Sequence, residues 1–359
     1  MFDFLDNWLA TGGFWVAVPL IIVGCVALIK GADFLVDGAS GLAKKYGVSD
    51  IVIGLTVVAF GTSMPEFVVN MVAVGQGSTE IAITNVLGSN IINTFVILGC
   101  TALIFPISSQ KATRNFDIPF SMLAALLVLL FAVYNSPSWL QIEHIFNMNI
   151  ADPTLSDLGS IQMGQGNGGF ISGVGGSILL IFFLIFLWHN FKGIGSAPQT
   201  ESNEGYKPMS AKRALALILG GLVGLVVGGE LIVKSATSIA HSLGVSDAII
   251  GLTVVALGTS LPELATSCMA AFKKNCDIAL GNVIGSNIFN IFFILGTSAC
   301  VKALPGYHGL EIDALMAALG SVLVMLFVYF TKKHEIKRWH GAILLLTYAA
   351  YLTYRIITL

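Results

Sequence analysis

Ten long apolar runs divide this chain, and each is long enough to cross a lipid bilayer as a helix. A transmembrane helix needs about 20 apolar residues to span a hydrocarbon layer of about 30 Å, and lipid offers no partners to unpaired backbone groups. Because 55% of the 359 residues are hydrophobic and only 11% are charged, we predict an all-α polytopic membrane protein with ten transmembrane helices. The runs lie near residues 14–36, 50–74, 80–104, 115–134, 171–191, 212–234, 247–272, 278–303, 310–331 and 340–358.

Lysine and arginine are distributed unevenly between the segments that join these runs. Cytoplasmic segments of membrane proteins carry an excess of both residues. With the N-terminus outside the cell, 14 of the 18 basic residues fall in or beside cytoplasmic segments, whereas residues 135–170 on the outside contain none. We therefore expect an inner or plasma membrane protein with both termini outside and residues 192–210 in the cytoplasm. The fourteen are Lys44, Lys45, Lys111, Arg114, Lys192, Lys207, Lys212, Arg213, Lys273, Lys274, Lys332, Lys333, Lys337 and Arg338.

Two motifs recur in the chain at a constant offset of 197 residues. GLTVVAFGTSMPEFVVN at 54–70 matches GLTVVALGTSLPELATS at 251–267 at 11 of 17 positions. The same offset aligns NVLGSNIINTFVILG at 85–99 with NVIGSNIFNIFFILG at 282–296. The chain is therefore predicted to consist of two homologous halves, residues 1–191 and 211–359, joined by a flexible linker at 192–210.

The number of predicted helices in each half determines their relative orientation. Five spans are an odd number, so the second half must enter the membrane from the side opposite to the first. The charges agree, because Lys44 and Lys45 align with uncharged or weakly basic positions whereas Lys273 and Lys274 align with Gln76 and Gly77. We therefore predict two inverted five-helix repeats.

Both copies of the first motif interrupt an apolar run at the middle of the membrane. Glycine and proline in GTSMPE (61–66) and GTSLPE (258–263) break a helix, and the freed carbonyl groups are tolerated only where they line a polar cavity. Each break places a carboxylate, Glu66 or Glu263, within one turn of two hydroxyl groups. Such hard oxygen ligands suit Na⁺ and Ca²⁺. The hydroxyl groups are those of Thr62, Ser63, Thr259 and Ser260.

The second motif places polar side chains on spans 3 and 8. Ser89 and Asn93, and likewise Ser286 and Asn290, are spaced i, i+4 and share one helical face. We expect that face to line the same cavity. The asparagines beside them, which are Asn85, Asn90, Asn282 and Asn287, are expected to serve packing more than binding.

Other interpretations of these polar residues remain open. A protonated glutamate can form hydrogen bonds between helices, and hydroxyl groups often donate to their own helix. Asp33 and Glu230 occupy equivalent places near the ends of spans 1 and 6, where helix capping or interfacial solvation explains them, and Lys30 can pair with Asp33. They are not counted as site residues.

The paired motifs, GTSMPE with GSNIIN and GTSLPE with GSNIFN, resemble the two α-repeats of the cation/calcium exchanger superfamily, particularly the sodium/calcium exchangers. The resemblance covers both halves and implies an antiporter in which the residues named above ligate the cations around Glu66 and Glu263. It further implies backbone carbonyl ligands from Ala59 and Ala256, and a sliding of spans 1 and 6 that alternates access. Related exchangers often carry Asp at the position of Asn290, and its absence argues against potassium co-transport.

The leading hypothesis is therefore a secondary antiporter that exchanges Na⁺ for Ca²⁺. A Ca²⁺/H⁺ antiporter of the same superfamily is the alternative, since a buried glutamate can exchange Ca²⁺ for protons. A cation channel and an intramembrane hydrolase are remote possibilities. The five cysteines lack paired spacing, so neither a disulfide framework nor a tetrahedral metal site is expected. We predict no cofactor. The expected partners are Na⁺, Ca²⁺ and the lipid bilayer, with no nucleic acid and no obligate protein partner.

Overall fold

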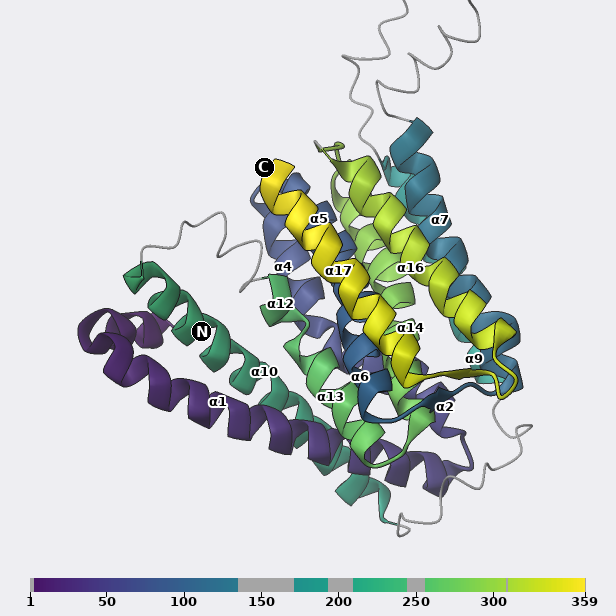
Figure 1. The fold of residues 1–359 in the computed structure, drawn as a ribbon, viewed down its shortest axis with the longest axis horizontal. Helices are drawn as coiled ribbons and strands as arrows, with labels where there is room; N and C mark the ends of the chain where they lie inside the picture. Colours follow the sequence, from purple (N-terminus) through teal and green to yellow (C-terminus); the bar gives the residue numbers. More distant parts are fainter. Residues whose placement is uncertain (1–2, 135–170, 193–208, 244–255, 308, 359) are drawn as a thin grey trace, which may run out of the picture.

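The computed structural model describes residues 3–134, 171–192, 209–243, 256–307 and 309–358. It is mostly helical (Figure 1), as predicted, and helices lie in the described part of every apolar run. Residues 247–255 of the seventh run, and the 192–210 linker apart from its ends, lie outside the described residues. The helix order in the first half is α1 (Asp3–Tyr46), α2 (Asp50–Ile53), the π-helix η1 (Gly54–Val58), α3 (Ala59–Thr62), α4 (Met64–Gly75), α5 (Thr79–Ile91), π-helix η2 (Ile92–Ile97), α6 (Leu98–Ile104), π-helix η3 (Thr113–Asp117), α7 (Ile118–Tyr134) and α9 (Gly173–Lys192).

The second half repeats this order. It comprises α10 (Ala211–Ser242), α12 (Ala256–Thr259), α13 (Leu261–Phe272), α14 (Cys276–Ile288), the π-helix η6 (Phe289–Leu295), α15 (Gly296–Val301), α16 (Leu310–Phe330) and α17 (Arg338–Thr358). A short antiparallel pair of strands, β1 (Ile107–Ser108) and β2 (Glu335–Ile336), joins the loop after α6 to the loop after α16. The sheet therefore links one half to the other.

Seven helices among the described residues are long and apolar enough to cross a membrane, or eight when the bent segment 50–75 is counted as one span. The predicted number of ten therefore stays a prediction. Helix α17 is not among the seven, and its 21 residues include Arg338 and Arg355 near its ends. The seven segments are Gly13–Tyr46, Thr79–Ile104, Thr113–Ala132, Gly173–Lys192, Ala211–Ser242, Cys276–Val301 and Leu310–Phe330.

Two of these segments form the centre of the bundle. Thr79–Ile104 and Cys276–Val301 are the most buried of the seven, and they occupy equivalent places in the two halves. Each contains a π-helical stretch, η2 or η6, that begins at an equivalent residue, Ile92 or Phe289. A π-helix inside an α-helix shifts the side chains out of the regular 3.6-residue register and is common at functional sites.

The first helix of each half, α1 and α10, forms a pair along one flank of the bundle (Figure 1). Small residues at seven-residue spacing meet across this pair: Gly24 faces Gly228, Gly31 faces Gly221, and Gly38 faces Ala214. A Cβ atom built on Gly24, Gly31 or Gly38 would lie within 2.9 Å of a carbonyl oxygen on α10, so glycine is needed for this close approach. The facing residues rise along α1 and fall along α10, which makes the two helices antiparallel.

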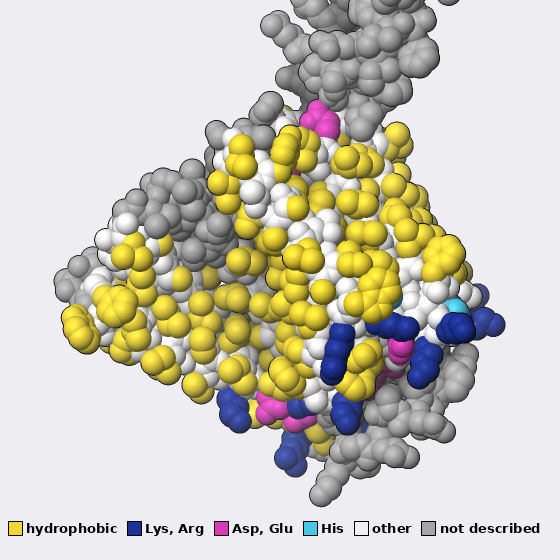
Figure 2. Space-filling model, viewed as in Figure 1, with side chains coloured by type: hydrophobic (Ala, Val, Ile, Leu, Met, Phe, Trp, Pro, Cys, Tyr) yellow, Lys and Arg dark blue, Asp and Glu magenta, His cyan; other side chains and the backbone are white. Residues whose placement is uncertain are grey.

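The surface separates apolar from charged regions. Hydrophobic side chains cover most of the visible face, whereas Lys and Arg gather at the lower end of the view (Figure 2). That end is where α13 meets α14, where α16 ends and where α17 begins (Figure 1). A broad apolar surface bounded by a basic edge is what a membrane protein exposes to lipid and headgroups.

Candidate cation-binding site

The first half breaks its second span at Ser63. This residue separates α3 from α4 with φ −85° and ψ 6°, and the helical segments on either side are bent by 45°. Pro65 stands in the first turn of α4. Because proline has no N–H, the carbonyl of Gly61 four residues earlier lacks its usual helical donor. The break predicted from the GTSMPE motif is thus present and has this cause.

The second half is broken in the same way at Ser260. This residue has φ −90° and ψ 5° and separates α12 from α13, with Pro262 in the first turn of α13. The carbonyl of Gly258 loses its helical donor for the same reason. The two breaks differ by only a few degrees in backbone geometry, as the repeated sequence leads one to expect.

The two breaks face each other through reciprocal hydrogen bonds. Ser63 Oγ donates to Glu263 Oε1 at 2.8 Å, and Ser260 Oγ lies 3.4 Å from Glu66 Oε1. Both glutamates are only 1% exposed. Each carboxylate of one half is therefore bound by the helix break of the other half, and the structure brings together four of the predicted site residues from opposite ends of the sequence.

Several buried side-chain oxygen and nitrogen atoms at this centre have no hydrogen-bond partner among the residues that the structure describes. They include Oε2 of Glu66 and of Glu263, Oδ1 of Asn290, and both amide atoms of Asn93. The ion pairs that the structure shows lie elsewhere, between Lys273 and two aspartates of α1 and between Arg355 and Asp313. Burying a carboxylate without a positive partner is costly. A bound cation would supply that partner.

The central helices add polar groups to the same region. Ser286 Oγ on α14 lies 3.5 Å from Glu263 Oε1, so it approaches the carboxylate that Ser63 also contacts. Asn290 in η6 donates from Nδ2 to Asn90 Oδ1 at 3.0 Å. Asn93 in η2 and Ser89 on α5 are 1% and 2% exposed. The π-helical stretches thus carry Asn93 and Asn290 into the interior.

Thr62 and Ala59 are already engaged in hydrogen bonds within the first break. Thr62 Oγ1 lies 3.0 Å from Asn282 Oδ1, 3.1 Å from the carbonyl oxygen of Val58 and 3.3 Å from that of Ala59. The Ala59 carbonyl also accepts the Ser63 N–H at 3.0 Å. In the second half, Ala256 begins α12 and Thr259 ends it. The Ala59 carbonyl therefore has only part of its accepting capacity left in this conformation.

Asn85 and Asn282 bind the backbone of the two glutamates. Asn85 Nδ2 donates to the Glu66 carbonyl at 3.3 Å, and Asn282 Nδ2 donates to the Glu263 carbonyl at 3.2 Å. Sequence reasoning assigned these asparagines mainly to packing, and the structure gives them a more specific role. Each asparagine follows its glutamate by 19 residues, a spacing that the repeat alignment already contained.

Asn70 and Ser267 were not singled out from the sequence at all. Asn70 Oδ1 accepts from Asn85 at 2.7 Å, and Ser267 Oγ accepts from Asn282 at 2.9 Å. Both residues are buried and occupy equivalent positions on α4 and α13. Because one is an amide and the other a hydroxyl, their equivalence is hidden when only identical residues are compared.

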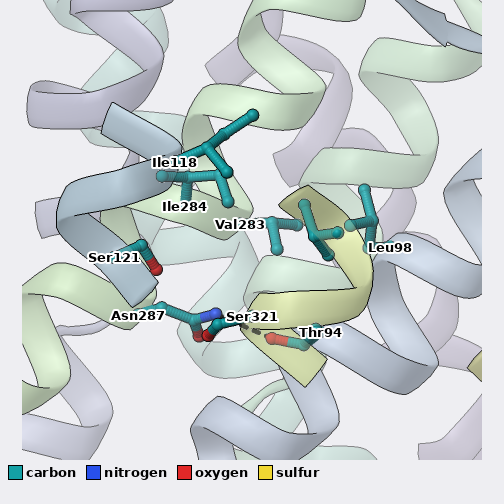
Figure 3. Close-up of a pocket in the computed structure, with 9 residues that line it drawn as sticks. Thr94, Leu98, Ile118, Ser121, Val283, Ile284, Asn287 and Ser321 are labelled. Atoms are coloured by element: carbon teal, nitrogen blue, oxygen red, sulfur yellow. Dashed lines mark hydrogen bonds between the residues drawn. The ribbon is translucent and has the colours of Figure 1, made fainter. Parts of the chain in front are cut away.

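A narrow crevice with a mostly apolar lining lies beside this centre (Figure 3). It is lined by residues of both halves, among them Thr94, Asn287 and Ser321, and Asn287 Nδ2 donates to Thr94 Oγ1 at 2.8 Å. The crevice leaves no space for a water molecule. Asn90 donates to the carbonyl of Asn287 at 3.2 Å, so the crevice continues the asparagine network of the centre and forms no separate site.

The oxygen atoms at the centre define the kind of ion that fits. No three side chains of His, Cys, Asp or Glu gather among the residues that the structure describes. The available ligands are instead carboxylate, hydroxyl and amide oxygens, the set that hard cations such as Ca²⁺ and Na⁺ prefer. Together with the apolar helices, this describes an integral membrane protein with a buried cluster of polar oxygen atoms.

The comparisons with known proteins agree with this class. The family model described as "Sodium/calcium exchanger protein" matches residues 16–192 and 213–357. The chain is 34% identical to sodium/calcium exchanger MaX1 of Methanosarcina acetivorans over 93% of its own length and 96% of that protein. It is 35% identical to putative antiporter CaxA of Alkalimonas amylolytica, over 94% and 97% of the two chains.

A solved structure shows the same fold. The sodium-calcium exchanger NCX_Mj, soaked with 2.5 mM Na⁺ and 10 mM Sr²⁺, matches with a TM-score of 0.75 and 30% identity, covering 95% of this chain and 99% of that one. This chain therefore belongs to the sodium/calcium exchanger family, as the paired motifs indicated. Its members are transporters, so the enzyme hypothesis is excluded, and the protein is a membrane antiporter of the cation/calcium exchange class.

Proposed function

We propose that this protein exchanges Na⁺ for Ca²⁺ across the membrane by alternating access, with extrusion of Ca²⁺ driven by the sodium gradient. The observation that carries the proposal is the pair of buried carboxylates, Glu66 and Glu263. Each approaches the serine of the opposite break through Oε1, and its Oε2 has no hydrogen-bond partner within the described part of the chain. Two negative charges held this way in a dry interior require cations.

The ligands that we propose are the residues around these two carboxylates. Ser63, Ser260 and Ser286 already approach a carboxylate oxygen, and Asn93 and Asn290 retain unpartnered oxygens. The remaining members are equivalent to these by the repeat offset or are backbone carbonyls at the breaks. The proposed set is Glu66, Glu263, Thr62, Ser63, Thr259, Ser260, Ser89, Asn93, Ser286, Asn290, Ala59 and Ala256.

The membrane arrangement belongs to the same proposal. We propose ten transmembrane helices in two inverted repeats, residues 1–191 and 211–359, with the linker 192–210 in the cytoplasm and both termini outside. The antiparallel packing of α1 against α10 supports the inversion. The basic end in Figure 2 supports the orientation in an inner or plasma membrane, because positive charges favour the cytoplasmic side.

The charge of the site bears on stoichiometry. Two ionised glutamates are neutralised by one Ca²⁺, whereas three Na⁺ would leave one positive charge. Asn93 and Asn290 add no carboxylate in either half. In a three-to-one exchange, the sodium-bound site would therefore carry one net positive charge. Calcium uptake would then depend on the membrane potential, which can be measured.

Exchange of Ca²⁺ for protons is the alternative. It is favoured by the similarity to a relative described only as a putative antiporter, CaxA, and by a site whose two acids could each take up a proton. The coupling ion distinguishes the two functions. A proton gradient imposed without Na⁺ would drive calcium movement only in the alternative.

The deciding experiment is uptake of radioactive calcium by Na⁺-loaded proteoliposomes, with and without an outward sodium gradient. We expect wild-type protein to accumulate calcium only with the gradient, and Glu66→Gln and Glu263→Gln to accumulate none. Uptake that follows a proton gradient instead would overturn the choice of coupling ion. Uptake that persists in both variants would overturn the assignment of the site.

A further inference from the structure

Asn282 lies outside the two helix breaks and forms hydrogen bonds to both of them. It is completely buried on α14. Its Nδ2 donates to the Glu263 carbonyl at 3.2 Å and to Ser267 Oγ at 2.9 Å, while its Oδ1 lies 3.0 Å from Thr62 Oγ1 of the other half. The backbone carbonyl of Glu263 can only accept a hydrogen bond, so the amide nitrogen of Asn282 must face Glu263. The amide oxygen of Asn282 must then face Thr62.

This orientation offers the hydroxyl hydrogen of Thr62 an acceptor on Asn282 at 3.0 Å, beside the carbonyl oxygens of Val58 at 3.1 Å and Ala59 at 3.3 Å. A hydroxyl group has one hydrogen and two lone pairs. When the hydrogen is donated to Asn282 Oδ1, both lone pairs on Thr62 Oγ1 are directed away from Asn282 and remain available to a cation. If the hydrogen is donated to the carbonyl oxygen of Val58 or Ala59 instead, both lone pairs remain but point in another direction.

We propose that Asn282 is a positioning residue that directs the lone pairs of the Thr62 hydroxyl toward a bound cation. The inference rests on the proposed function, since it assigns a role to a residue next to the proposed ligands and outside that set. It also makes the two halves unequal. Asn85, the equivalent of Asn282, donates to the Glu66 carbonyl and to Asn70 Oδ1. Among the described contacts, Asn85 forms no bond to Thr259.

Calcium titration of the purified protein by calorimetry tests this with a double-mutant cycle. Asn282→Ala should raise the Ca²⁺ dissociation constant about fivefold, the scale of one hydrogen bond. In a Thr62→Val background, the same substitution should change it less than about twofold, because the hydroxyl that it orients is already gone. Thr62→Ser retains the hydroxyl and should restore the effect of Asn282→Ala. Asn85→Ala is the matched control and should change binding less than Asn282→Ala.

Thermal unfolding of the same variants separates positioning from folding. Both asparagine variants should lower the melting temperature, because each removes buried hydrogen bonds, whereas only the calcium titration should distinguish them. Equal effects of Asn282→Ala in the wild-type and Thr62→Val backgrounds, or equal effects of the two asparagine variants on binding, would overturn the proposal. Because binding is measured directly, failure of sodium-driven uptake would count against the proposed function and not against Asn282.

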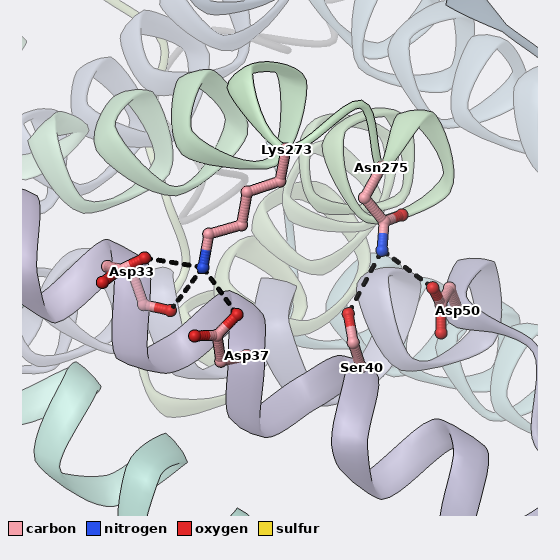
Figure 4. Close-up of polar contacts among 6 residues, drawn as sticks. All are labelled: Asp33, Asp37, Ser40, Asp50, Lys273 and Asn275. Carbon is pink, nitrogen blue, oxygen red and sulfur yellow. Dashed lines mark hydrogen bonds and ion pairs between the residues drawn. The ribbon is translucent and has the colours of Figure 1, made fainter. Parts of the chain in front are cut away.

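A different observation concerns the attachment of α1 to the rest of the bundle. Lys273, in the turn between α13 and α14, contacts Oδ1 of both Asp33 and Asp37 at 2.6 Å, and the carbonyl of Asp33 at 3.2 Å (Figure 4). Asp33 thus lies inside α1, which continues to Tyr46, so it does not cap the end of a helix. Its ion-pair partner in the described structure is Lys273 of the other half, where the sequence suggested Lys30. All three side chains are partly exposed.

The same turn makes a second contact beside this ion pair. Asn275 Nδ2 donates to Ser40 Oγ at 3.1 Å and to Asp50 Oδ2 at 2.8 Å, while its Oδ1 caps the first turn of α14 (Figure 4). Lys273 and Asn275 therefore attach α1 at the end that carries the basic residues.

The equivalent positions at the opposite end have different chemistry. By the 197-residue offset, Lys273 corresponds to Gln76, which is exposed, and Asp37 corresponds to Lys234. A glutamine cannot form an ion pair with the acidic equivalent of Asp33, which is Glu230. The ion pair that Lys273 forms with Asp33 therefore has no counterpart of the same chemistry at Gln76.

We infer that Lys273, Asp33 and Asp37 form a one-sided latch that favours the conformation seen here over its inward–outward counterpart. The latch rests on alternating access as proposed above. Partly exposed ion pairs are weak, so the bias is a few-fold and can be overcome in each transport cycle. A pair of this strength tunes the balance between two states without locking one.

Hydrogen exchange of purified protein in lipid nanodiscs tests the latch without transport. Lys273→Gln, which copies the residue of the other half, should speed amide exchange over residues 30–46 about threefold relative to wild type. Lys274→Gln is the matched control, because it removes the same charge at the next residue and should leave that segment unchanged. Exchanging the charges, with Lys273→Glu combined with Asp33→Lys and Asp37→Lys, should restore the slow exchange.

Equal exchange in Lys273→Gln and Lys274→Gln would overturn the latch, as would a charge-exchanged variant that stays fast. Wild-type protein that fails to accumulate calcium would count against the proposed function, whereas the exchange rates would still report whether the ion pair holds α1. The two failures are therefore distinguishable.

Discussion

The helix breaks at Ser63 and Ser260 have almost the same backbone, yet their side chains are bound differently. The φ angles of the two serines differ by 5° (−85° and −90°) and each break is followed by proline in the first helical turn. Glu263 has Ser63 Oγ at 2.8 Å and Ser286 Oγ at 3.5 Å, whereas Glu66 has Ser260 Oγ at 3.4 Å. The carboxylate of the second half is therefore held more firmly.

This difference shows what duplication preserves. Backbone geometry follows from glycine, serine and proline at fixed positions, which are identical in the two motifs. The side-chain network differs although its contacting residues are identical in type, since Ser63 corresponds to Ser260, Ser89 to Ser286 and Asn85 to Asn282. The first break is bonded to α14 through Thr62 and Asn282. Two sites with the same scaffold can thus have different affinities.

The largest expected effect is the loss of either charge. Glu66→Gln and Glu263→Gln each remove one of two carboxylates from a site that contains no other acid among the proposed ligands. We expect calcium binding to weaken more than about 100-fold in both variants, because charges at contact distance in a protein interact by several kcal/mol. Calcium titration by calorimetry measures this.

The matched control is Glu80→Gln, which neutralises an exposed glutamate near the start of α5. Its calcium affinity should equal that of the wild type. A large loss in only one of the two central variants would show that the halves differ more than their hydrogen bonds suggest. A large loss in Glu80→Gln would mean that overall charge, and not the centre, controls binding.

The second prediction concerns the prolines that cause the breaks. Pro65→Ala and Pro262→Ala each restore an N–H that can bond to the carbonyl of Gly61 or Gly258, so the helix can straighten. We expect exchange to fall by about tenfold or more while the melting temperature stays the same or rises, since alanine favours a continuous helix. Calcium uptake and thermal unfolding of the same preparations test the two parts separately.

If either variant is both less stable and less active, the loss reflects folding, and the break has no special role. If both keep full exchange, the bend at the serine does not depend on proline. Unequal losses of exchange activity in the two variants would show which of the two breaks contributes more to transport.

Much of this arrangement could be predicted from the sequence, and the exceptions have physical reasons. Glycine and proline determine the breaks locally, so GTSMPE and GTSLPE were sufficient to locate them. Which serine approaches which glutamate depends on packing between residues about 200 apart, and no local pattern encodes it. The attachment of Lys273 to α1 was missed for the same reason, because its partners lie in the other half.

The third prediction compares the reciprocal serines. Ser63→Ala removes a hydroxyl 2.8 Å from Glu263, and Ser260→Ala removes one 3.4 Å from Glu66. Hydrogen bonds to a charged group are worth about 1.5–3 kcal/mol when short, so Ser63→Ala should weaken calcium binding about tenfold or more and Ser260→Ala less. Equal losses would indicate that both hydroxyl groups act mainly as direct cation ligands, whose contribution does not depend on the distance to the carboxylate.

The last prediction concerns folding stability instead of ion binding, and it tests the surroundings of each break by adding a methyl group to its glycine. A Cβ atom on Gly258 would overlap Val233 Cγ2 on α10, and one on Gly61 would lie 2.6 Å from Leu222 Cδ2 of the same helix. Valine is branched at Cβ and cannot easily turn aside, whereas the end of leucine can adopt another rotamer. Gly258→Ala should therefore cost about 1–3 kcal/mol of stability, the usual scale of overpacking, and Gly61→Ala less. Thermal unfolding measures the difference, and combining Gly258→Ala with Val233→Ala should recover most of the loss. If the double variant recovers nothing, the glycine serves the backbone of the break itself and not its contact with α10.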